Sequence, residues 1–69
     1  MTLHEAMKRI LKQQPDHTMD CDKLADQVWN QGLYCRQDGN KAESWQLCWR
    51  ARKYPHIFSL DGTNIKLND

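Results

Sequence analysis

The first apolar pattern of the chain begins at Leu3, and apolar residues recur three, four, seven and eight positions after it. This spacing is that of one buried face of an amphipathic helix. Thr2 followed by Glu5 forms a capping-box pattern at its start. Pro15 disfavours helical geometry just beyond its end. The pattern predicts a helix over about residues 3–13.

A second stretch repeats apolar residues at the same spacing and is bounded by stronger signals at both ends. Asp20 suits the N-cap position, and Gly32 suits a left-handed residue after the last turn. Leu33 can then fold back on Val28, the apolar contact that accompanies such an ending. The sequence therefore predicts a helix over about residues 21–31.

A third helix is predicted over about residues 41–54, with Asn40 as its N-cap, Glu43 three residues later and Pro55 after its end. It carries two stripes on nearly opposite sides: Leu47, Ala51 and Tyr54 on one, and Trp45, Trp49 and Arg52 on the other. Both stripes cannot face one small core. We expect the leucine stripe to face inward, with Trp45 also largely buried and Trp49 less so.

The last pattern changes from helical spacing to alternation. Phe58 and Leu60 alternate with polar residues on one arm, and Ile65 and Leu67 do so on the other. The dipeptide Asp61-Gly62 between the arms suits a two-residue type I′ turn. Residues 57–67 are therefore predicted to form a β-hairpin, which needs packing against the helices to be stable.

These elements make a small α+β domain, with three helices followed by a C-terminal β-hairpin. That order is the order of a winged helix, in which helices two and three form the helix-turn-helix and the hairpin is the wing. A three-helix bundle with a C-terminal tail is the alternative. The length of 69 residues predicts one domain, residues 1–69, and leaves no room for a large catalytic cleft.

Charge is balanced overall but not along the chain. The formal net charge is +1, whereas residues 41–53 hold four basic residues and one acidic residue. Positive charge is thus concentrated on the third predicted helix.

Three cysteines, Cys21, Cys35 and Cys48, form no CxxC pair. Their odd number and wide spacing predict free thiols, no disulfide framework and an intracellular, cytoplasmic protein. Together with the three histidines they show none of the short spacings of structural zinc sites, so we expect no metal and no cofactor. No apolar run approaches the length of a membrane span.

The segments LHEAMKRIL, CDKLADQVWNQGLYCRQDG, RARKYPHIFSLDG and IKL together resemble the HARE-type helix-turn-helix family. The resemblance covers nearly the whole chain and implies a winged helix, with duplex DNA as partner and a role in transcription regulation. A similar domain in the bacterial RNA polymerase delta subunit is linked to protein contacts instead. The chain departs from the family in carrying Trp45 and Trp49 on the third helix, where smaller or polar residues are expected.

Two binding modes follow for the third helix. In the first, duplex DNA is bound by its cations and amide: Lys41, Gln46, Arg50 and Lys53. In the alternative, an exposed strip binds a protein: Trp45, Trp49 and Arg52.

No phosphate loop, nucleophile elbow or paired-carboxylate motif is present, so we expect no enzyme activity and no small-molecule substrate.

Overall fold

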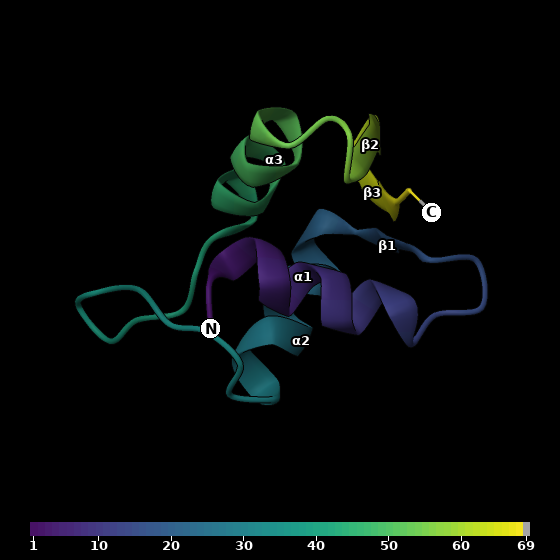
Figure 1. Ribbon diagram of the computed structural model, residues 1–69. Coiled ribbons are helices and arrows are strands. Elements are labelled where there is room, and N and C mark those ends of the chain that lie inside the picture. Colours follow the sequence, from purple (N-terminus) through teal and green to yellow (C-terminus); the bar gives the residue numbers. More distant parts are fainter. Residues whose placement is uncertain (69) are drawn as a thin grey trace.

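The computed structural model describes residues 1–68 as three helices and a three-stranded antiparallel sheet with strand order β1-β3-β2 (Figure 1). The elements in chain order are α1 (Leu3–Lys12), β1 (Thr18–Asp20), α2 (Cys21–Asn30), α3 (Ser44–Lys53), β2 (Phe58–Asp61) and β3 (Asn64–Leu67). The architecture is thus a small α+β fold.

The first helix begins as its sequence predicts. The Thr2 hydroxyl accepts the N–H of Glu5 at 3.3 Å, and the Glu5 carboxylate accepts the N–H of Thr2 at 3.4 Å. Helix α1 ends at Lys12, one residue earlier than predicted, and Gln13 is its C-cap. All five residues of its apolar stripe are buried.

The second helix ends in the predicted glycine motif. Gly32 has a φ of 65°, the left-handed region that glycine adopts without steric cost. The Leu33 N–H donates to the Val28 carbonyl at 3.1 Å, and the Gly32 N–H donates to the Trp29 carbonyl at 3.0 Å. These two bonds define a Schellman ending, which places Leu33 over the last turn of α2.

Helix α3 begins at Ser44, so the prediction of a start at residue 41 with Asn40 as N-cap is wrong. Asn40 is engaged in the preceding loop instead: its N–H donates to Asp38, and its carbonyl accepts the N–H of Arg36. Glu43 is the N-cap, and the Gln46 side chain accepts its N–H at 2.9 Å. A capping pair thus forms three residues later than predicted.

The C-terminal hairpin forms where the alternation predicts it, with apolar residues opposite one another. Phe58 faces Leu67, and Leu60 faces Ile65. The turn differs by one residue, because Asp61 pairs with Asn64 and leaves Gly62 and Thr63 as the loop. Gly62 has a φ of 61° and Thr63 does not have a positive φ, a combination typical of type II′ rather than type I′.

Strand β1 is an element that the sequence analysis does not predict. It pairs antiparallel with β3, with Thr18 opposite Lys66 and Asp20 opposite Asn64. The Cys21 N–H extends this pairing by donating to the Thr63 carbonyl at 2.8 Å. The hairpin is therefore held to the helices through the segment that leads directly into α2.

One hydrophobic core lies between the helices and the sheet. Its largest fully buried side chains come from every helix and from both hairpin strands: Leu3, Met7, Ile10, Leu11, Leu24, Val28, Leu47, Phe58 and Ile65. Helix α1 contacts both other helices and β3, which gives it a central position (Figure 1).

None of the helices in residues 1–68 has the length and apolar character needed to cross a membrane.

Candidate functional site

The outward face of α3 carries two tryptophans that are both largely exposed. Trp45 is 58% exposed and Trp49 is 66% exposed, so the prediction that Trp45 is largely buried is wrong. Each lies two residues from Leu47, which is about 200° around a helix. Since Leu47 is fully buried, the two indoles must point away from the core.

Two cations of the last turn lie beside Trp49. Trp49, Arg52 and Lys53 line a shallow hollow on the surface. Lys53 follows Trp49 by four residues and therefore sits on the same face of the helix. We call the face formed by Trp45, Trp49, Arg52 and Lys53 the tryptophan strip.

The strip combines residues that the sequence analysis assigned to different faces. Lys53 was grouped with Arg50 and Gln46 as a nucleic-acid-binding set, but it lies beside Trp49. Arg50 is half-buried at the flank of α3. Lys53 therefore belongs both to the predicted nucleic-acid set and to the tryptophan strip.

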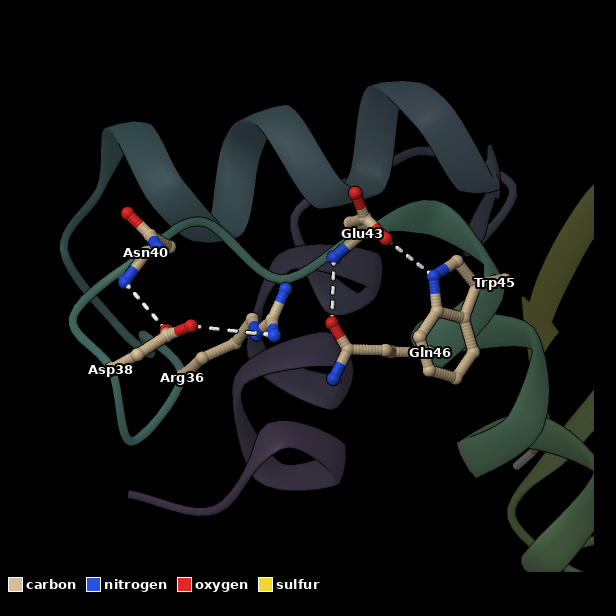
Figure 2. A network of polar contacts seen from close by, with 6 residues as sticks. All are labelled: Arg36, Asp38, Asn40, Glu43, Trp45 and Gln46. Carbon is tan, nitrogen blue, oxygen red and sulfur yellow. Dashed lines mark hydrogen bonds and ion pairs between the residues drawn. The ribbon is translucent and has the colours of Figure 1, made fainter.

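Two further members of that set have local structural partners. The Lys41 ammonium pairs with the Asp26 carboxylate of α2, and Lys41 precedes α3 instead of belonging to it. The Gln46 side chain accepts the Glu43 N–H at the start of the helix (Figure 2). Both side chains thus hold the entry to α3 in place.

The side chain of Trp45 is held by a hydrogen bond. Its indole N–H donates to the Glu43 carboxylate at 2.5 Å (Figure 2). Because Glu43 is the N-cap, this contact places a negative charge at the N-terminal edge of the tryptophan strip. It also restricts the rotamers of an exposed aromatic side chain, so less freedom is lost if a partner covers it.

The opposite end of α3 is basic. Arg50, Arg52 and Lys53 lie in its last turn, where cations are favoured by the helix dipole. Among residues 1–68, none of their head groups forms an ion pair or hydrogen bond with another side chain. The strip thus runs from an acidic edge to a basic edge, with two tryptophans between them.

The loop before α3 is closed by its own polar contacts. Arg36 pairs with Asp38 at 3.3 Å, and Asp38 accepts the Asn40 N–H at 3.1 Å (Figure 2). The Asn40 N–H is the main cause that lowers the pKa of Asp38, and Arg36 adds to it. Gly39 completes this turn with a φ of 84°. The loop is therefore tied to itself just ahead of the helix.

A third exposed tryptophan, on α2, was missed by the sequence analysis. Trp29 belongs to the apolar stripe of α2, yet it is 42% exposed. With Met1, Leu33 and Tyr34 it borders a surface hollow at the end of that helix. Its position directly after Val28, about 100° around the helix, places it at the edge of the stripe.

The three thiols have different environments. Cys21 is buried, Cys48 is half-buried and Cys35 is exposed, and all three are free. Burial, together with the neighbouring Cys48 thiol, raises the pKa of Cys21 to about 11. Within residues 1–68, no group of three or more His, Cys, Asp or Glu side chains is arranged to hold a metal ion.

Comparisons with known proteins do not identify a family. A scan against protein-family models, a search of curated proteins and a search of solved structures each gave no match. The resemblance to the HARE-type family thus stays an interpretation of the sequence.

Proposed function

We propose that the chain is a non-catalytic interaction module that binds a protein through the tryptophan strip. We also propose that its fold is a winged helix, with α2 and α3 as the helix-turn-helix and the β2–β3 hairpin as the wing. The order of the elements supports this fold, as does the hairpin that follows α3 directly.

The exposure of both tryptophans carries the proposal. A tryptophan at a surface leaves a large apolar area in water, and Trp and Arg are the residues most enriched among interface hot spots. Here two tryptophans and an arginine share one face of one helix. That clustering favours a protein interface over the scattered apolar exposure found on any domain.

Duplex DNA is the second candidate partner. It is favoured by the basic last turn of α3, whose cations have no partners within residues 1–68. Base reading is less well supported, because Gln46 caps the helix and Lys41 pairs with Asp26. The centre of the outward face is aromatic, whereas major-groove reading relies on hydrogen-bonding side chains.

Photo-cross-linking tests the proposed protein partner. A benzophenone amino acid is placed at position 49, and in a matched control at the exposed Arg9 of α1. The proposal expects protein adducts in the producing cells from position 49 and few from position 9. Their masses identify the partners. Equal labelling from both positions would contradict it.

A duplex titration tests the second candidate separately. If DNA is the partner, affinity falls as salt rises, with a log-log slope of roughly 0.9 per phosphate contact. The double variant R50A/K53A should then reduce that slope, and Trp49→Ala should matter less. The protein-binding proposal expects no salt-dependent affinity of this kind.

A further inference from the structure

We propose that the basic end of the tryptophan strip, formed by Trp49, Arg52 and Lys53, binds an acidic peptide segment that also carries an aromatic or large aliphatic side chain. The inference rests on the proposed function, because it uses the same face, and it names the chemistry of the partner. It is drawn from the two cations that flank an exposed indole.

The two cations lie on either side of Trp49. At about 100° per residue, Arg52 lies about 60° to one side of Trp49 around α3, and Lys53 lies about 40° to the other. Side chains on a helix lean toward its N-terminus, so both cations reach back over the turn that holds the indole. The three side chains border one hollow of about 440 Å³. A ligand in this hollow therefore meets an apolar surface and two cations at once.

Both cations are available to an anion from outside the chain. Arg52 and Lys53 are exposed, and neither forms an ion pair with another side chain in residues 1–68. A guanidinium holds a carboxylate through two parallel hydrogen bonds, and a neighbouring ammonium adds a point charge. A Glu or Asp side chain of the partner thus has a matching pair of cations at this end of the strip.

The indole of Trp49 adds a requirement for an apolar group. It is 66% exposed, and only an apolar or aromatic side chain removes its surface from water without leaving a polar group unpaired. The cations follow Trp49 by about 4.5 and 6 Å along the helix axis, and an extended segment advances about 3.3 Å per residue. The acid and the apolar residue of the partner should therefore lie one to three positions apart.

The other end of the strip has the opposite sign of charge. Trp45 borders a second hollow together with Asp22 and Glu43, neither of which has a cationic partner within residues 1–68. The two cations that border this hollow are engaged in ion pairs: Arg36 with Asp38, and Lys41 with Asp26. A nucleic acid carries a charge at every phosphate, so its backbone would meet like charge on continuing toward Trp45. An acidic peptide can place its carboxylates at the basic end alone.

The size of the site favours a segment over a folded domain. Three side chains at one end of a helix cover far less than the roughly 1,200 Å² of a stable interface between folded proteins. Peptide recognition relies instead on a few anchoring side chains. The binding should therefore be weak, and it should weaken further with salt because its ion pairs form at the surface.

Selection from a random peptide display library on the immobilised full chain tests the inference. The selected peptides should be enriched in Glu and Asp, with an aromatic or large aliphatic residue one to three positions away. Fluorescence anisotropy of synthetic copies of the enriched peptides then gives their dissociation constants.

Two tryptophan variants locate the apolar contact. Trp49→Ala should raise the dissociation constant of these peptides at least about tenfold. Trp29→Ala is the matched control, because it removes another exposed indole, on α2, and should leave the affinity unchanged. Circular dichroism of each variant verifies that its helices form.

Charge reversal locates the acidic contact. The double variant R52E/K53E should raise the dissociation constant at least about tenfold, because like charges then meet. A peptide whose acids are replaced by lysines should bind this variant better than wild type, which a misfolded chain would not do. R9E/K12E is the matched control: it reverses an Arg and a Lys in the last turn of α1 and should change nothing.

The outcomes separate this inference from the proposed function. A library that gives no binder, binders without an excess of acidic residues, or affinities that R52E/K53E leaves unchanged would each overturn the acidic partner. Duplex DNA binding that R52E/K53E abolishes, in the absence of any selected peptide, would assign the cations to nucleic acid instead. If position 49 still cross-links to proteins, the proposed function stands without this inference. If position 49 cross-links to no protein, the proposed function fails as well.

Discussion

The hydroxyl of Thr63 donates a hydrogen bond to Asp20 Oδ1 at 2.8 Å, across 43 residues of sequence. The other carboxylate oxygen, Oδ2, accepts the N–H of Asp22 at 3.0 Å and so caps α2. One side chain thus joins the start of a helix to the turn of the hairpin. The Thr63 hydroxyl is the main cause that lowers the pKa of Asp20, and the Asp22 N–H adds to it.

Thr63→Val should destabilise the fold near neutral pH by removing this donor. The pKa of Asp20 is lower in the folded state than its usual 3.8. The hydrogen bonds to the ionised carboxylate therefore add to the free energy of unfolding above about pH 3.8. This contribution is lost as pH falls through the folded pKa. Urea unfolding at pH 7 and at pH 2.5 should therefore show a difference between variant and wild type that shrinks in acid.

Asp20→Asn is the control for that experiment. An asparagine can still cap the helix and accept from Thr63, but it does not titrate. The effect of Thr63→Val should then be nearly independent of pH in the Asn background. If Asp20 is present, and the stability difference between Thr63→Val and wild type still stays constant down to pH 2.5, that would contradict the role given to the Asp20 carboxylate.

The sequence predicts the elements whose signals are local. The Thr2 capping box, the Gly32 ending of α2 and the alternating arms of the hairpin all follow from residues a few positions apart. Strand β1 has no such signal, because three residues are too few to show alternation. It exists because β3 offers a free edge, which only the tertiary structure reveals.

The start of α3 was misplaced because two capping patterns overlap. Asn40 with Glu43 and Glu43 with Gln46 both fit the spacing of a capping box. The loop decides between them: Asn40 closes the turn with Asp38, residues 41–43 stay outside the helix, and Ala42 is buried. Neither contact can be read from spacing alone.

The candidate site could be predicted in part. Helical spacing gives Trp45 and Trp49 a common face, and it gives Leu47 the opposite one. Spacing does not show that Lys41 pairs with Asp26, because these residues lie 15 positions apart and belong to different elements. Nor does it show that Trp45 is held outward by the Glu43 carboxylate.

Gly62→Val should destabilise the hairpin. Gly62 has a φ of 61°, and an added Cβ would meet no atom within 4 Å, so the cost comes from the backbone and not from a clash. That cost is at least about 1–2 kcal/mol for a residue other than glycine, and larger for a β-branched one. Chemical denaturation measures it. Gly62→Asn should lower the free energy of unfolding less than Gly62→Val does. Equal losses of stability for the two variants would contradict the argument.

The three thiols should react with a thiol reagent at clearly different rates at pH 8. Cys35 is exposed and should react first, followed by the half-buried Cys48. Cys21 is buried, and a pKa of about 11 leaves about one thiolate in a thousand at that pH. Mass spectrometry of the labelled peptides gives the order. Labelling of Cys21 as fast as Cys35 in the folded protein would contradict the buried environment.

Trp49→Ala should leave the stability of the isolated chain nearly unchanged. Trp49 is 66% exposed, and surface substitutions away from caps and core usually change the free energy of unfolding by less than about 0.5 kcal/mol. Ile65→Ala is the contrasting variant, because Ile65 is fully buried and its loss should cost about 2–5 kcal/mol. Urea unfolding of both variants at low micromolar concentration makes the comparison.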